Sequence, residues 1–276
     1  MRFGIKLAYW LSLRKRISAK ASLQSDVFDL ITRFRPIECS LEMIRLGSNN
    51  DGGYLVPKSL DGVVGCFSPG VSNNTSFEDD LLSRFNIPSF LTDPSIEGSK
   101  ASEKIAKKFD LEFKYLRSFN AENSVDLSTW INWKGLEATP DYSLILQMDI
   151  EGGEYEVLTS VSDVTLSKFR YLIIEFHEIE KWNEMHFFDE VKPGLQKLLT
   201  SFLPVHFHPN NHNQYGWVHG RKFPKCFEVT LVNKTFMEGG SNFYSSRPVS
   251  SLPHPLDQPN NPEKPDIFVS WDEYSE

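Results

Sequence analysis

The chain is poor in cysteine and has none of the cysteine spacings that hold zinc. Three cysteines occur in 276 residues, and they are widely separated, at Cys39, Cys66 and Cys226. Without a C-x-x-C pair, the sequence gives no support for a zinc–cysteine site. The low and odd count is typical of a reducing compartment such as the cytoplasm, where free thiols act as small apolar side chains.

Basic residues are fewer than acidic ones. The formal net charge is -8, with 29 Lys and Arg residues against 37 Asp and Glu residues. A general nucleic-acid-binding protein would carry a basic surface, so no nucleic-acid partner is expected. The glycine-rich turn G-x-G-x-x-G is missing as well, which argues against a nicotinamide-linked oxidoreductase.

Long apolar runs are lacking too, which limits what the N-terminus can do. Phe3, Leu7, Trp10 and Leu11 follow helical spacing among several Lys and Arg residues. This apolar part is too short to cross a bilayer, and it has no small-residue site for signal-peptide cleavage. Two interpretations are open. The helix packs on the domain, which we favour, or it lies on the inner membrane surface as a peripheral contact.

Strands and helices alternate along most of the chain. Apolar runs predict seven strands. Six lie at residues 63–67, 89–93, 113–116, 171–176, 204–208 and 227–232, and the fourth in chain order opens the stretch 143–158 with the apolar run 144–146. Helical patterns lie between most of them, but no clear helix separates the last two, so an antiparallel final pair is expected. The predicted fold class is α/β: a Rossmann-like, seven-stranded, mostly parallel sheet with helices on both faces and the last strand antiparallel.

Composition divides the chain into three parts. Residues 1–42 are predicted to form a helical N-terminal extension, residues 43–246 the α/β domain, and residues 247–276 a proline-rich tail. Such a density of proline excludes regular structure in the tail. Apolar side chains such as Leu252, Ile267 and Trp271 can still anchor it, so we expect the tail to pack along the domain surface.

An acidic turn follows the fourth predicted strand. Asp149, Glu151 and Glu154 surround Gly152 and Gly153, directly after an apolar run. Ligands of open α/β sheets bind at the carboxyl ends of the strands, so Asp149 and Glu151 are candidate catalytic residues. Glu154 is explained by the helix that begins there, because the helix dipole favours a carboxylate at its N-terminus.

The first predicted strand ends in a loop of small residues. This loop contains Gly70, Val71, Ser72 and Asn73, and a helix with a capping-box pattern from Thr75 to Glu78 follows it. Small residues before a helix let the backbone approach a ligand closely.

Asp93 ends the second predicted strand, roughly twenty residues after this loop. Nucleotide-binding α/β domains place a carboxylate at about this spacing to accept hydrogen bonds from ribose hydroxyls. Further upstream, Asn-Asn-Asp-Gly-Gly predicts the turn of a hairpin. Asp51 and Tyr54 belong either to this turn alone or to a wall of the ligand crevice.

His177 and His208 stand at or near the ends of two later strands. One hypothesis makes one of them a general base that a carboxylate orients. A second makes Asp149, His177 and His208 the ligands of a divalent metal ion. A third treats both histidines as hydrogen-bonded structural residues.

Several segments carry a family resemblance. LQMDIEGGEYEVL, at residues 146–158, is similar to the pattern K-x-D-x-E-G-x-E-x-x-V-L of FkbM-type methyltransferases, which use S-adenosylmethionine on a class I methyltransferase fold. RLGSNNDGGYLVP, SPGVSNNTSFE and IIEFH, at residues 45–57, 68–78 and 173–177, also resemble the wider group. The likeness covers roughly residues 43–232, and it departs at Gly70, where this loop has fewer glycines than usual.

The resemblance implies a cofactor site for S-adenosylmethionine. Gly70, Val71, Ser72 and Asn73 would border its methionine part, with Glu78 nearby. Asp93 would bind the ribose, and Asn120 and Ala121 would lie near the adenine. Asp149 would face the reacting centre, and Asp51 and Tyr54 would form a wall.

The implied reaction is O-methylation of a hydroxyl on a carbohydrate or related polyhydroxyl, with a small molecule or glycan as acceptor. An alcohol is a poor acid, so a general base or a divalent metal ion is needed. Three other functions stay open. They are a nicotinamide-linked oxidoreductase, a metal-dependent hydrolase that uses the acid–histidine rim, and a non-catalytic binding module.

Overall fold

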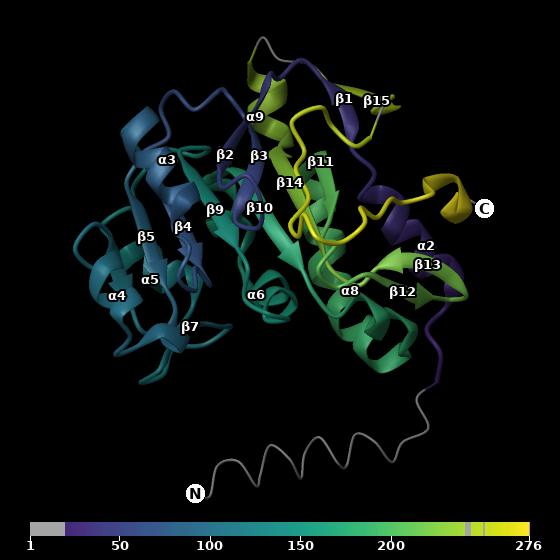
Figure 1. The fold of residues 1–276 in the computed structure, drawn as a ribbon, viewed down its shortest axis with the longest axis horizontal. Coiled ribbons are helices and arrows are strands. Elements are labelled where there is room, and N and C mark those ends of the chain that lie inside the picture. Colours follow the sequence, from purple (N-terminus) through teal and green to yellow (C-terminus); the bar gives the residue numbers. More distant parts are fainter. Residues whose placement is uncertain (1–19, 241–243, 251, 276) are drawn as a thin grey trace, which may run out of the picture.

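A seven-stranded sheet in the order β11-β14-β10-β9-β4-β5-β6 forms the centre of the computed structural model, which describes residues 20–240, 244–250 and 252–275 (Figure 1). The strands are β4 (Gly65–Pro69), β5 (Ser89–Thr92), β6 (Asp110–Glu112), β9 (Leu144–Met148), β10 (Phe169–Phe176), β11 (Phe202–Pro209) and β14 (Phe227–Asn233). The pairs from β10 to β6 are parallel, whereas β14 runs antiparallel to both β10 and β11. The predicted fold class, including the antiparallel last strand, is confirmed.

Helices cover both faces of the sheet because successive side chains of a strand point to opposite sides. In β9, Leu144, Leu146 and Met148 enter one apolar cluster, and Ile145 enters another. The first cluster contains residues of α2 (Gln24–Arg33), α5 (Leu127–Trp133), α6 (Glu154–Ser160), α7 (Asp163–Ser167) and α8 (Met185–Ser201). The second contains residues of α3 (Ser76–Phe85) and α9 (Lys234–Gly239). A small third cluster joins β5 to α4 (Lys100–Ile105).

The predicted hairpin is present and lies on the second face. Its strands are β2 (Met43–Gly47) and β3 (Gly53–Pro57), which pair antiparallel with Gly47 opposite Gly53. Tyr54, Val56 and Leu46 of this hairpin are buried against the sheet cluster. The turn between the strands therefore carries Asp51 to the carboxyl edge of the sheet.

The third strand of the sheet was predicted in the wrong place. β6 lies before the predicted range 113–116, and Tyr115–Leu116 instead form β7, which pairs with β8 (Ser124–Val125) in a separate ribbon. Thr92 Oγ1 accepts a hydrogen bond from Lys114 N at 3.3 Å and donates to Lys114 O at 2.5 Å. These bonds hold the chain beside the end of β5, where it leaves the sheet.

The predicted capping box at the start of α3 is also wrong. Thr75 makes no side-chain capping bond, and Ser76 N donates instead to Asn74 Oδ1 at 3.1 Å. Glu78 turns inward and accepts a hydrogen bond from Ser68. Glu78, which the sequence pattern assigned to a capping box, is thus a buried residue.

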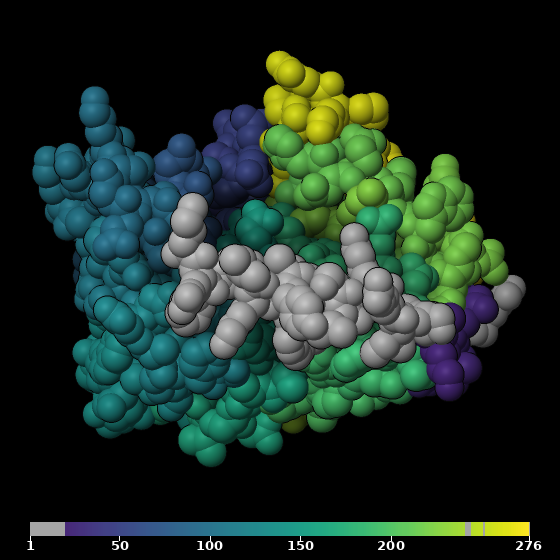
Figure 2. Space-filling view, turned by 90° about the horizontal axis from the view of Figure 1, so that it is seen from below, coloured from purple at the N-terminus to yellow at the C-terminus, as the bar shows by residue number. Residues whose placement is uncertain are grey.

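The C-terminal tail contains short regular segments, contrary to the prediction. β15 (Tyr244–Pro248) pairs antiparallel with β1 (Ile37–Cys39), and a single 3-10 turn, η3, covers Trp271–Tyr274. Proline is tolerated in β15 because this strand lies at the edge of a two-stranded sheet. Between these segments the tail, yellow in Figure 1, passes over the green strands β14 and β11. Figure 2 shows yellow C-terminal residues packed against green ones, with dark blue residues beside them.

The remaining elements are short and connect the sheet strands. They are η1 (Pro94–Ile96), η2 (Ile179–Asn183), β12 (Tyr215–Val218) and β13 (Arg221–Pro224). The basic helix expected at the N-terminus falls on residues 1–19, which lie outside the described residues. Among the helices of the described ranges, none is both long enough and apolar enough to span a bilayer.

Candidate functional site

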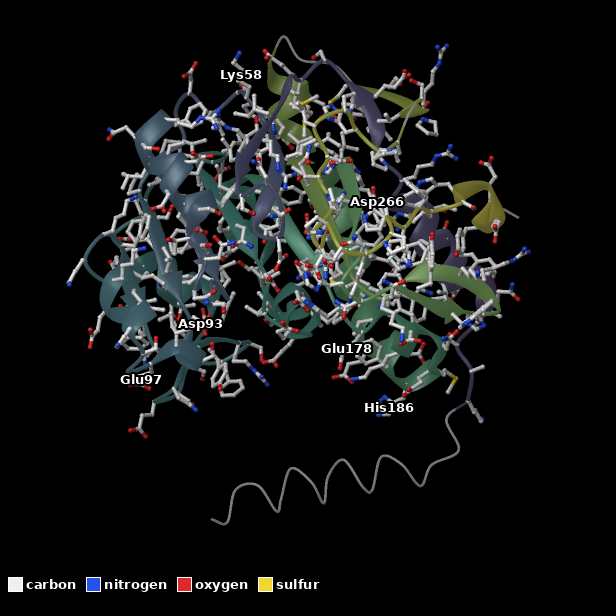
Figure 3. The ribbon with its side chains drawn as sticks, in the orientation of Figure 1. Lys58, Asp93, Glu97, Glu178, His186 and Asp266 are labelled. Carbon is white, nitrogen blue, oxygen red and sulfur yellow. The ribbon has the colours of Figure 1, made fainter. Side chains whose placement is uncertain are left out.

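The candidate site lies at the carboxyl edge of the parallel strands. β4, β5, β9 and β10 all run in the same direction, so the residues that follow them meet along one edge. Asp93 follows β5 and Glu178 comes shortly after β10, and Figure 3 shows both toward the lower side of the molecule. Residues far apart in the sequence therefore share this edge.

The loop after β4 is seated directly on β9. Gly70 has φ +85°, and a Cβ atom there would lie 1.6 Å from Asp149 O. Gly70 N donates to Thr92 O at 2.9 Å, and Asp149 N donates to Pro69 O at 3.2 Å. Only glycine fits this backbone at such a close approach.

Asp93 fixes the same loop from the other side. Its Oδ2 accepts from Ser72 N at 2.7 Å, and its Oδ1 accepts from Ser95 N at 2.8 Å and from Ser95 Oγ at 2.6 Å. The carboxylate thus joins the end of β5 to the loop after β4.

A cavity opens between this loop, the hairpin turn and Asp149. It encloses about 510 Å³, including space that is open to solvent. Its lining contains the expected residues Asp51, Tyr54, Gly70, Val71, Ser72, Asn73, Glu78 and Asp149. It also contains Gly52, Asn74, Phe77 and Gln147, which the sequence patterns did not single out.

Glu78 provides a buried carboxylate in the lining of this cavity. Its side chain is 2% exposed, and its Oε2 has no hydrogen-bond partner. Burial raises the pKa of Glu78 to about 7, although the hydrogen bond from Ser68 opposes the rise. Ser68 Oγ also lies 2.6 Å from Gln147 Oε1, and Gln147 Nε2 donates to Tyr54 OH at 3.2 Å. Glu78, Ser68, Gln147 and Tyr54 therefore form a continuous set of buried polar contacts. The unpartnered Oε2 of Glu78 lies at one end of this set.

Glu154 holds His177, a role that the sequence did not reveal. Its side chain is 0% exposed, and its Oε1 lies 3.0 Å from His177 Nδ1. The same oxygen accepts a hydrogen bond from Ile150 N at 3.1 Å. A glutamate in a first helical turn usually faces solvent, so its local pattern gave no signal of this contact.

Carboxylates also surround the other nitrogen of His177. Its Nε2 lies 3.5 Å from Glu151 Oε2, 3.6 Å from Glu175 Oε1 and 3.7 Å from Asp149 Oδ1. Burial lowers the pKa of His177, but the hydrogen bond and charge of Glu154 and the charges of Glu175 and Asp149 raise it to about 9. Burial and the charge of Glu175 hold the pKa of Asp149 well above its usual range, while the charge of His177 opposes this rise.

Glu175 and Glu228 extend the acidic group along the sheet. They are directly opposite each other in the pairing of β10 with β14, and both are buried. Glu175 Oε1 accepts from Asn210 Nδ2 and from Cys226 Sγ, each at 2.8 Å. Burial is the first cause that raises the pKa of each glutamate to about 7. A charged residue inside the strand IIEFH was visible in the sequence, but its partner on β14 was not.

His208 is not brought together with Asp149 and His177. It lies on β11, which β14 separates from β10. Its Nε2 is 3.1 Å from Asn260 Oδ1, and its Nδ1 is 3.7 Å from Asp257 Oδ1. Within the described ranges, no group of at least three ligand atoms suited to a metal ion includes His208. The expected ligand set of Asp149, His177 and His208 is therefore not assembled.

Asn120 and Ala121 lie in the β7–β8 ribbon and are not among the residues that line the cavity. Asn120 Oδ1 accepts from Asp126 N at 2.9 Å, and Asn120 Nδ2 donates to Thr129 Oγ1 at 3.0 Å. These bonds tie Asn120 to the start of α5. Its amide is thus engaged with the protein itself.

Comparison with known proteins agrees with this geometry. Residues 88–198 match the family model described as the methyltransferase FkbM domain. A search of curated proteins found no match. The matched region runs from β5 into α8 and contains Asp93, Asp149, Glu154 and His177. Residues 88–198 are therefore similar to a methyltransferase FkbM domain, and this matched part includes the acid–histidine cluster at the strand ends.

Proposed function

We propose that this chain is an S-adenosylmethionine-dependent O-methyltransferase that acts on a hydroxyl of a carbohydrate or a related polyhydroxyl. The observation that carries this proposal is the buried, unpartnered Oε2 of Glu78, which belongs to a cavity that Gly70 opens to close backbone approach. A carboxylate oxygen without a donor is costly in the interior unless a ligand supplies one.

The cavity fits S-adenosylmethionine by the chemistry of its lining. Glu78 would pair with the ammonium group of the methionine part, and the backbone from Gly70 to Asn73 would border that part. Asp93 is not part of the lining but is bonded to Ser72, which is. It can accept about four hydrogen bonds, of which the protein supplies three, so one position is open to a ribose hydroxyl. When bound, this cofactor supplies a methyl group on a positively charged sulfur.

Asp149 is the residue proposed to receive the proton of the acceptor hydroxyl. It lines the cofactor cavity and also faces His177. Its raised pKa makes it a stronger base than an ordinary carboxylate, because a base works best when its pKa approaches the working pH. The His177 ring, which Glu154 fixes, lies 3.7 Å from Asp149 and helps to orient it.

The rim beyond Asp149 favours a neutral acceptor that is rich in hydroxyl groups. Asp51 and Glu151 are exposed and offer acceptor oxygens, which hydroxyl donors can satisfy, and the buried Glu175 and Glu228 lie near them. The same charges repel phosphorylated or carboxylated acceptors. We therefore propose a neutral sugar or polyol in place of an anionic one.

We place this activity in the cytoplasm. Cys66 and Cys226 are buried free thiols and Cys39 is also unpaired, as suits a reducing compartment. Contact with the inner membrane surface would depend on the basic residues of the first nineteen positions.

Titration calorimetry with S-adenosylhomocysteine tests the cofactor assignment. We expect the wild-type chain to bind it and Glu78→Gln to bind it about tenfold more weakly, because the ammonium loses its charged partner. Glu97→Gln changes an exposed glutamate outside the cavity and should leave binding unchanged. Binding of NAD without binding of S-adenosylhomocysteine would overturn the proposal.

A screen with methyl-labelled cofactor tests the acceptor class. Neutral sugars and polyols should accept label, and their phosphorylated counterparts should accept far less. Preferential labelling of the phosphorylated set would contradict the acceptor assignment while leaving the cofactor assignment intact.

A further inference from the structure

The orientation of the His177 ring is fixed from one side. Nδ1 faces Glu154 Oε1 at 3.0 Å, and Ile150 N holds the same oxygen at 3.1 Å. Nε2 therefore points away from Glu154, toward the carboxyl edge of β9. Histidines that bind metal ions usually donate their other ring N–H to a carboxylate in this way.

The atoms around Nε2 have the spacing of an ion-binding shell. Three carboxylate oxygens lie 3.5 to 3.7 Å from it, on Glu151, Glu175 and Asp149. These separations exceed an ordinary hydrogen bond. Two ligand atoms that each lie about 2.1 Å from one ion stand roughly 3.0–3.4 Å apart. A shift of a few tenths of an ångström would thus let these atoms share a cation.

One of these three oxygens, Asp149 Oδ1, is buried with no hydrogen-bond partner. Glu175 Oε1 accepts from Asn210 and Cys226, while the second carboxylate oxygens Glu154 Oε2 and Glu175 Oε2 are buried without a partner. Within the described part of the chain, the ion pairs recorded for Asp149, Glu151, Glu154 and Glu175 are all with His177. Four carboxylates around one imidazole leave an excess of negative charge that a divalent ion would balance.

We propose that Asp149, Glu151 and His177 Nε2 bind a divalent cation, with Glu175 facing the same position. Ligand atoms of the first three residues lie within 4.8 Å of one another. Glu151 is 86% exposed, so an ion can enter from solvent. The alternative set of Glu175, His177 and Cys226 is more enclosed, because Cys226 and Glu175 are both buried.

The ligand types select an ion that accepts both oxygen and nitrogen. Carboxylates suit Mg²⁺, Ca²⁺ and Mn²⁺, whereas imidazole suits later transition metals. Mn²⁺ tolerates both, and it is therefore the probe. The role of the ion, which is to polarise the acceptor hydroxyl beside the cofactor cavity, rests on the proposed function. The binding of the ion to these residues does not depend on that function.

The test is direct binding of Mn²⁺ to the full chain, without cofactor, measured by calorimetry and by the loss of the free Mn²⁺ signal in electron paramagnetic resonance. We expect one ion per chain. Glu151→Gln should weaken binding by about tenfold or more, because it removes a charged ligand without disturbing a buried contact. His177→Gln should weaken it further, and Glu97→Gln should match the wild type.

Each result decides the proposal. Failure of Mn²⁺ to bind, or equal affinity in Glu151→Gln and Glu97→Gln, would overturn it. Tight Zn²⁺ binding that Cys226→Ser abolishes and Glu151→Gln leaves unchanged would assign the ion to the enclosed set instead. If Mn²⁺ binds as expected but S-adenosylhomocysteine does not, the ion site stands and the proposed function falls.

Discussion

Gly70 joins the loop after β4 to the strand that carries Asp149. Its positive φ and its contact with Asp149 O leave no room for a side chain. Gly135 also has a positive φ, +68°, but nothing lies within 4 Å of the place where its Cβ would be. Comparing alanine variants at the two glycines therefore distinguishes the energy of backbone strain, which both share, from the energy of a steric clash, which only Gly70 would have.

Gly70→Ala should lower the free energy of unfolding by roughly 3 kcal/mol or more, because strain and a clash with backbone add together. Gly135→Ala should lower it by only about 1–2 kcal/mol, the energy of the left-handed conformation alone. Urea denaturation measures both. Equal losses in the two variants would show that the loop can move away from β9.

His177 owes much of its positive charge to Glu154. Replacing this carboxylate by an amide keeps the side-chain size and removes the charge. In Glu154→Gln the pKa of His177 should fall from about 9 by about one unit or more, which a pH titration of the imidazole by nuclear magnetic resonance measures. Glu180→Gln, at a glutamate that pairs with Lys225 instead, is the control. An unchanged pKa in Glu154→Gln would place the source of the shift elsewhere.

Site residues that directly follow an apolar strand could be predicted from the sequence. Site residues whose position depends on a contact with a residue far away in the sequence could not. Asp149 and Gly70 follow apolar runs, and the structure places both at the cavity. Glu154 was attributed to the helix dipole because local spacing cannot show that His177 lies against it. His208 was grouped with His177 because both sit near strand ends, but the antiparallel strand between them is a property of the whole sheet.

At the scale of elements, the clearest error concerns β6. This strand lies at the edge of the sheet, and Asp110, Leu111 and Glu112 are exposed or half-buried. An edge strand needs little apolar sequence, so the nearby run from Phe113 to Leu116 gave the stronger signal. The buried strands β9 and β10, by contrast, were found from their continuous apolar sequence.

One amide side chain of the C-terminal tail is bonded to three separate parts of the domain. Asn260 Nδ2 donates to Glu228 Oε1 at 2.5 Å and to Asp51 Oδ1 at 3.3 Å, while Asn260 Oδ1 lies 3.1 Å from His208 Nε2. A single buried residue thus connects the hairpin turn, β14 and β11. No local pattern in the proline-rich sequence indicates this contact.

Asn260→Ala should weaken the docking of the tail by about 1–3 kcal/mol, because it leaves buried polar groups without partners. Hydrogen exchange should become faster across residues 252–275, with little change in β9. Asn261→Ala is the matched control, since Asn261 Oδ1 accepts from Glu263 N in an exposed turn. If both variants exchange alike, Asn260 is not the anchor.

At the scale of the whole molecule, buried acids make stability depend on pH. The pKa values of Glu78, Glu175 and Glu228 are raised from 4.5 to about 7, and that of His177 is raised from 6.5 to about 9. The folded chain therefore keeps protons that the unfolded chain has already released. By linkage, the free energy of unfolding must fall as pH rises through this interval.

Urea denaturation of the metal-free chain should show this decline between about pH 5 and pH 9. The share of His177 is fully present below about pH 6.5 and is lost as pH rises through about 9. A rise from 4.5 to about 7 corresponds to about 3 kcal/mol for Glu78, so Glu78→Gln should flatten the decline below pH 7 by up to this amount. Glu122→Gln, at an exposed site, should not. A stability that rises with pH would contradict the assignment of buried protons.

The position of Asn260 has a consequence for how the protein is made. A ribosome releases the chain from its N-terminus, so the strands that form the sheet emerge before residue 260 does. Until then Glu228, Asp51 and His208 lack the side chain that joins them. The crevice beside the cavity is thus completed only after the whole sheet has been made, and a chain that a protease or a premature stop shortens before Asn260 lacks the side chain that joins these three residues.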